Sequence, residues 1–63
     1  MCEATAYLLK NGQEELILKD VDVIEPDGDS VRIVNIFGEQ KVLKAVIHSL
    51  NLINHKVILV EKA

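Results

Sequence analysis

The sequence EATAYLLKNGQEELILK, residues 3–19, has the strongest turn signal of the chain at its centre. Asn11 and Gly12 both tolerate a positive φ, which two-residue β-hairpins require, and apolar side chains flank them on either side. We therefore predict one strand over residues 3–9 and a second over residues 14–19. Valine and aspartate alternate over residues 20–23, which indicates that the second strand continues, half-buried, around a bend.

The remaining sequence has the same character, because short runs rich in valine and isoleucine are separated by turn residues. A turn is predicted at Pro26-Asp27-Gly28-Asp29, since proline fixes φ and glycine supplies a left-handed position. A third strand is predicted over residues 31–37, followed by a hairpin at Gly38-Glu39 and a strand over residues 40–45. The last strand, residues 55–61, has apolar side chains on both faces, which is typical of a central strand or of a strand at a dimer interface.

The segment of residues 42–53 fits two structures. Val42, Val46 and Leu50 are spaced four residues apart, which favours a helix. The β-branched side chains favour a strand, because they lose rotamer freedom in a helix. We predict a strand to Ala45 and then one short helical turn over residues 46–50.

Five short strands in 63 residues predict a single all-β domain spanning residues 1–63. The fold expected is a small, strongly bent barrel of the SH3 or Sm-like (Hfq-like) kind, because closure removes exposed sheet edges. A chain of this size has a small core and needs a further source of stability. One cysteine cannot close an intramolecular disulfide, so a metal or a partner chain remains. The apolar last strand favours a homodimer.

Composition and charge exclude several classes of protein. The chain is 49% hydrophobic and 27% charged, and it has no apolar run of about 20 residues, so a soluble protein without a membrane span is expected. Its start lacks the features of a signal peptide, which predicts a cytoplasmic location. The net charge is −3, the basic residues are scattered, and Tyr7 and Phe37 are the only aromatic residues, so nucleic acid is not the expected partner. No serine–histidine–acid spacing is present, and we predict that the chain is not an enzyme.

Cys2 has the most distinctive chemistry in the sequence. A cysteine at this position combines its thiolate with the terminal amine and a backbone nitrogen, and a metal can displace the protons of amine and thiol near neutral pH. Planar nitrogen and sulfur donors suit Ni(II) or Cu(II) better than Zn(II). Two chains related by a two-fold axis would supply two nitrogens and two sulfurs. The alternative is that Cys2 is an inert, small apolar residue, as a lone cysteine often is.

His55 and His48 are the other candidate ligands. Either could bind a metal axially or hydrogen-bond to a ligand, and His55 is the one that we name as a second candidate. The two histidines are seven residues apart without a cysteine or carboxylate at ligand spacing, so they define no zinc motif.

Four stretches of the chain resemble one known family. They are Met1-Cys2-Glu3-Ala4, Asp20-Val21, residues 31–38 with the end Ile36-Phe37-Gly38, and residues 50–59. Together they are similar in length and order to the CooT-type nickel-binding proteins. The resemblance implies a cytoplasmic homodimer with an Sm-like barrel, which binds Ni(II) through the cysteine after the initiator methionine, here Cys2 from each chain. It also implies a role in supplying nickel during maturation of carbon monoxide dehydrogenase.

The predicted function is therefore that of a Ni(II) chaperone or store, with the metal bound at Cys2 in a homodimer. The alternative is an Sm-like RNA-binding module, because members of this family have also been labelled predicted RNA-binding proteins. A third possibility is a dimeric barrel that only contacts another protein.

Overall fold

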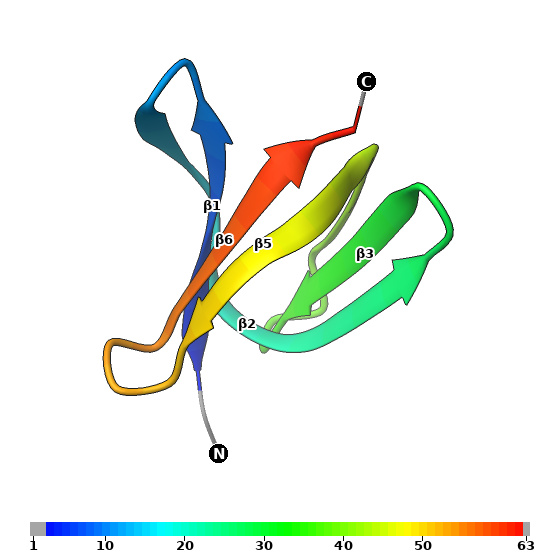
Figure 1. Ribbon diagram of the computed structural model, residues 1–63. Helices are drawn as coiled ribbons and strands as arrows, with labels where there is room; N and C mark the ends of the chain where they lie inside the picture. The colour runs from blue at the N-terminus through cyan, green and yellow to red at the C-terminus, as the bar shows by residue number, and fades with distance from the viewer. Residues whose placement is uncertain (1–2, 63) are drawn as a thin grey trace.

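The computed structural model describes residues 3–62, and in this part of the chain six strands form one sheet (Figure 1). The order of the strands is β4-β3-β2-β1-β6-β5. Their bounds are β1 Ala4–Lys10, β2 Gln13–Asp27, β3 Ser30–Asn35, β4 Gln40–Leu43, β5 Ala45–Asn51 and β6 Lys56–Glu61. The predicted all-β class is confirmed, with six strands in place of the five expected.

The first hairpin forms at the predicted position. Asn11 and Gly12 have φ angles of 52° and 76°, and Lys10 lies opposite Gln13. Two consecutive positive φ angles give the turn the twist that the flanking strands require. The pair β1–β2 is therefore specified by a local signal.

Strand β2 is long and bent, and its two halves pair with different neighbours. Its first half, to Val21, pairs with β1, and its second half, from Val21, pairs with β3. Asp20 has a φ of 55°, and the register with β3 shifts just after it. Figure 1 shows β2 curving from one half of the sheet into the other. The predicted continuation around a bend is confirmed.

The second hairpin turns at Gly28-Asp29, because Asp27 pairs with Ser30. Glycine with a φ of 61° stands first in this turn, as in hairpins of the type II′ kind. Pro26 belongs to β2 and not to the turn predicted from it. Proline is tolerated there because Pro26 and Val31 form a non-hydrogen-bonded pair, next to the hydrogen-bonded pair Asp27 and Ser30. The backbone nitrogen of Pro26, which has no N–H, therefore does not face β3.

Strand β6 is central, as predicted, and connects the two ends of the chain. It pairs in parallel with β1, where Thr5 lies opposite Lys56, and antiparallel with β5. Its side chains Val57, Ile58 and Leu59 are all buried. The core consists of Ala6, Leu8, Leu18, Val21, Val31, Ile33, Ala45, Val57 and Leu59.

Two of the predicted elements are wrong. Residues 46–50 do not form a helical turn, because they belong to β5, whose pairing with β6 brings Val46 opposite Val60 and Leu50 opposite Val57. The four-residue spacing was outweighed by these long-range strand pairs. The predicted third strand is also too long, since β3 ends at Asn35 and residues 36–39 form the loop to β4.

The predicted barrel is not confirmed, and neither is its SH3 or Sm-like type. The sheet of residues 3–62 has two edges, β4 and β5, and no ladder joins them. The chain bends at Lys44 between the four-residue β4 and β5, and β5 then pairs with β6. The described part of the chain also holds no helix that could span a membrane.

Candidate functional site

The beginning of β1 and the β5–β6 turn lie side by side at one end of the sheet. The backbone N–H of Thr5 donates a hydrogen bond to the carbonyl oxygen of His55, at 2.8 Å. Figure 1 shows both segments at the same end of the molecule. We call this region, Glu3 to Thr5 together with residues 52–55, the N-terminal end of the sheet.

Cys2, the first predicted ligand, lies outside the described residues. Glu3, the first residue described, is exposed, and Ala4 pairs with Val21 of β2. The register of β1 is therefore fixed within two residues of Cys2. The prediction for the thiolate itself stays a prediction.

His55, the second predicted ligand, is exposed and ends the β5–β6 turn with a φ of 52°. This left-handed conformation is uncommon for residues other than glycine, asparagine and aspartate, although histidine adopts it more often than most residues do. The hydrogen bond holds the backbone of His55 beside Thr5. Thr5 is three residues after Cys2 in the sequence. His55 is thus the histidine that the fold brings to the beginning of β1.

His48 lies elsewhere. The register of β5 with β6 shifts between Ile47 and Ser49, so His48 is the extra residue of a β-bulge opposite Leu59 and Ile58. Among residues 3–62, no three histidine, cysteine, aspartate or glutamate side chains are grouped as a metal site would need.

The β5–β6 turn is ordered by one side chain that the sequence analysis did not single out. The Oδ1 atom of Asn51 accepts hydrogen bonds from the backbone N–H groups of Ile53, at 3.1 Å, and Asn54, at 3.0 Å. Such a turn is a common use of asparagine and could have been suspected from its place after an apolar run. The turn holds Leu52 and Ile53, which are 75% and 89% exposed.

Lys56 joins three strands on the outer face beside this end. Its Nζ atom lies 2.6 Å from Oε1 of Glu14 on β2 and 5.1 Å from the ring centroid of Tyr7 on β1. The hydrogen bond to Glu14 is the main reason that the pKa of Lys56 is raised above 10.5, with smaller favourable effects from the charges of Glu14 and Tyr7. The interaction fixes β6 and β2 on either side of β1.

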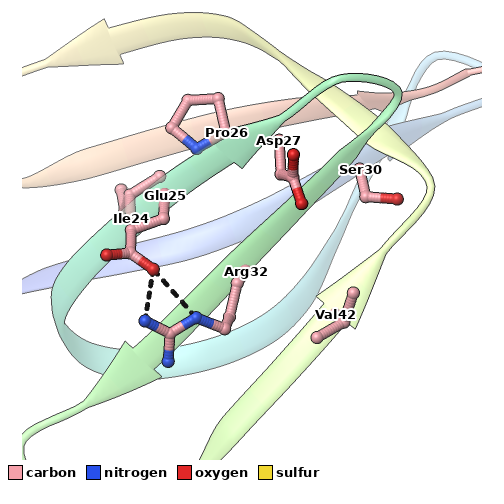
Figure 2. A pocket seen from close by; sticks show the side chains of 7 residues that line it. All are labelled: Ile24, Glu25, Pro26, Asp27, Ser30, Arg32 and Val42. Atoms are coloured by element: carbon pink, nitrogen blue, oxygen red, sulfur yellow. Dashed lines mark hydrogen bonds and ion pairs between the residues drawn. The ribbon is translucent and has the colours of Figure 1, made fainter.

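A shallow hollow of about 490 Å³ lies at the other half of the sheet, near the β2–β3 hairpin (Figure 2). Its polar centre is Arg32, whose Nε donates to Oε1 of Glu25 at 3.0 Å and whose Nη1 donates to Oε1 of Gln40 at 3.1 Å. Because Glu25 already neutralises the guanidinium, the hollow is a poor site for an anion. It is lined by Ile24, Glu25, Pro26, Asp27, Ser30, Arg32 and Val42.

Comparison with known proteins agrees with the resemblance seen in the sequence. Residues 1–60 match the model of the family described as CO dehydrogenase accessory protein CooT. The chain belongs to the CooT family. The match includes the Met1-Cys2 start, the first five strands and all of β6 except its last residue, Glu61.

A solved CooT structure has the same fold. The crystal structure of a protein assigned as CooT from Carboxydothermus hydrogenoformans superposes with a TM-score of 0.91 and 39% sequence identity. The similarity covers 98% of this chain and 100% of the other. No curated protein matches the chain. CooT is an accessory protein family, which points to a role other than catalysis.

Proposed function

We propose that this chain binds Ni(II) through Cys2 in a homodimer and supplies the metal for maturation of a CO dehydrogenase. Membership of the CooT family, whose model matches residues 1–60 and is described as a CO dehydrogenase accessory protein, is the observation that carries the proposal. A protein of this class would act in the cytoplasm, where its thiol stays reduced. Its role is delivery or storage of the metal, not catalysis.

The donors available near residue 2 suit nickel. The thiolate of Cys2 and a nearby terminal or backbone nitrogen form a planar pair of soft and borderline donors, and two such pairs complete a four-coordinate Ni(II) site. Residues 3–62 provide no group of three ligands, so a complete site needs the donors of residue 2, and two copies provide enough of them. A site built at a chain terminus has few enclosing walls, which allows the metal to be passed on.

His55 is the side chain best placed to assist. Its backbone is hydrogen-bonded to Thr5, its side chain is exposed, and no other histidine of the described chain lies at the N-terminal end of the sheet. It would bind the metal axially or accept a hydrogen bond from a ligand. In either role it adjusts affinity and is secondary to Cys2.

The test is a Ni(II) titration of the reduced chain by calorimetry and absorption spectroscopy, with Cys2→Ser alongside. We expect one metal per two chains and thiolate-to-nickel charge-transfer bands for the unmodified chain. Cys2→Ser should lose both and keep its secondary structure, because residue 2 precedes the first strand. Unchanged affinity in Cys2→Ser would remove the proposed site.

A matched pair of histidine variants measures the contribution of His55. His55→Gln should weaken nickel binding by a smaller factor than Cys2→Ser, whereas His48→Gln should leave it unchanged, because His48 lies in the β5 bulge. Equal effects of the two variants would assign no special role to His55.

A further inference from the structure

The β3–β4 loop, residues 36–39, presents the single phenylalanine of the chain to solvent. Phe37 is 73% exposed, and its neighbour Ile36 is 40% exposed. Aromatic side chains can bury about 150–250 Å² each and are enriched in the centres of protein–protein interfaces. A single exposed apolar residue is common on soluble proteins, so the conformation and the position of the loop decide what this one means.

The loop is held in one conformation by its own hydrogen bonds. The backbone N–H of Asn35 donates to the carbonyl oxygen of Glu39 at 2.9 Å, and that of Gly38 donates to the carbonyl oxygen of Asn35 at 3.1 Å. The N–H of Ile36 donates to the carbonyl oxygen of Asp20 at 2.9 Å, which fixes the loop to the bend of β2. The buried side chain of Asn35 accepts two further N–H groups. An ordered loop loses little conformational entropy when a partner binds, so its aromatic side chain is presented in advance.

The strand register places this loop at the same end of the molecule as the beginning of β1. Ala4 lies opposite Val21 of β2, and Val21 lies opposite Asn35, the last residue of β3. Neighbouring strands are about 4.8 Å apart, so β3 ends about 10 Å from the beginning of β1. In Figure 1, β3 ends in the lower part of the molecule, where β1 begins. A protein that approaches the beginning of β1 therefore meets the loop.

We infer that residues 36–39 are the docking surface for the protein that receives the metal, with Phe37 as the anchor that enters an apolar pocket of this partner. The inference rests on the proposed function, in which the metal is bound at residue 2 and passed to a CO dehydrogenase. The receiving protein has to approach the N-terminal end of the sheet for the transfer. The loop offers it a large, preorganised apolar contact there.

The charges beside the loop indicate what surrounds the pocket of the partner. Asp20 and Asp22 lie at the bend of β2, and Glu39 is the last residue of the loop. These three carboxylates outnumber the neighbouring basic residues, Lys19 and Lys41. None of the three forms an ion pair with a lysine or arginine of residues 3–62. A pocket rimmed by lysine or arginine side chains therefore complements this surface.

The experiment measures the affinity of the nickel-loaded chain for nickel-free CO dehydrogenase from the same organism, by biolayer interferometry. Phe37→Ala should raise the Kd at least about tenfold, because it removes the side chain that fills the pocket. Leu16→Ala is the matched control, since Leu16 is 52% exposed in the first half of β2, opposite Tyr7 and away from the loop. Its Kd should stay within about twofold of that of the unmodified chain. The affinity of the unmodified chain should fall as salt is added, because opposite charges are then screened.

Two further measurements separate this inference from the proposed function. The nickel stoichiometry and the sedimentation of Phe37→Ala should match those of the unmodified chain, because the side chain of Phe37 offers no metal donor and is exposed. Failure of the proposed function would appear as loss of nickel binding in the unmodified chain itself.

Three results would overturn the inference while nickel binding stays intact. The unmodified chain could bind nickel but not the enzyme. Phe37→Ala could bind the enzyme as tightly as Leu16→Ala does. Phe37→Ala could also sediment as a monomer, which would assign the loop to contact between copies of the chain. Affinity that does not change with salt would overturn the basic rim of the pocket.

Discussion

Asn35 shows how one side chain sets the end of a strand. It is 5% exposed, and its Oδ1 atom accepts hydrogen bonds from the N–H groups of Phe37, at 3.0 Å, and Glu39, at 2.9 Å. Its Nδ2 atom donates to Oε1 of Glu39 at 2.6 Å. These bonds close the loop of residues 36–39 and stop β3 two residues earlier than the apolar pattern predicts. Phe37 is consequently left on the surface.

Asn35→Ala should lower the free energy of unfolding by about 2 kcal/mol, because two backbone N–H groups lose their acceptor in a partly buried loop. Urea denaturation followed by circular dichroism measures the change. The double variant Asn35→Asp, Glu39→Gln is the informative control, since it keeps the acceptor for the two backbone N–H groups and avoids placing two carboxylates in contact. An alanine variant as stable as the unmodified chain would show that water replaces the side chain.

At the scale of the elements, Lys56 connects the three central strands of the outer face. Its pKa is raised, chiefly by the hydrogen bond to Glu14, so the ammonium is favoured more in the folded than in the unfolded chain. A raised pKa means that the stabilisation is complete below the unfolded pKa of about 10.4 and is lost as the pH rises through the folded value.

The stability difference between the unmodified chain and Lys56→Met should therefore be constant from neutral pH to about pH 10 and decrease above it. Methionine retains an apolar contact with Tyr7 and removes the charge, which makes it a close comparison. Chemical denaturation at a series of pH values measures the difference. A difference that persists well above the pKa of lysine would attribute the effect to packing.

The elements specified by local signals could be predicted from the sequence. Asn11-Gly12 and Gly28 fix two hairpins through positive φ angles, and the apolar residues on both faces of β6 marked it as central. Elements that depend on distant partners could not. The helical spacing of residues 42–50 was overridden by pairing of β4 with β3 and of β5 with β6, and the number of strands followed from the bend at Lys44.

The same distinction applies to the candidate site. Cys2 could be singled out from its position and its donor atoms alone. The proximity of His55 to the beginning of β1 depends on parallel pairing between residues 51 positions apart, Thr5 and Lys56. No short-range pattern encodes such a pair. The exposure of the apolar side chains in β5 and the β5–β6 turn was also missed, because it depends on the sheet order and not on the apolar composition.

At the scale of the whole molecule, the expected free energy of unfolding is small. At roughly 0.05–0.15 kcal/mol per residue, 63 residues correspond to an unfolding free energy of about 3–9 kcal/mol. Ten apolar side chains of the described chain are buried, and Ile33 and Leu59 are the largest that are fully enclosed. Each of these buried side chains therefore contributes a large part of the free energy of unfolding.

Leu59→Ala should cost about 3 kcal/mol, since it removes a side chain with no exposed surface from the centre of the core. We expect a large fall in Tm and a substantial unfolded fraction at ambient temperature. Val42→Ala, at a side chain that is 62% exposed, should change stability by less than about 1 kcal/mol. Thermal unfolding of both variants measures this contrast, and similar Tm values would contradict the assigned core.

The pairing of β1 with β6 has a consequence for the order in which the protein is made. Ribosomes add about 5–20 residues per second, so Lys56 is added roughly 3–10 s after Thr5, the residue opposite which it pairs. During that interval β1 has only one of its two neighbours, β2, because its other neighbour, β6, has not yet been added. The start of the chain is thus translated first and reaches its final structure among the last, when β6 has left the ribosome.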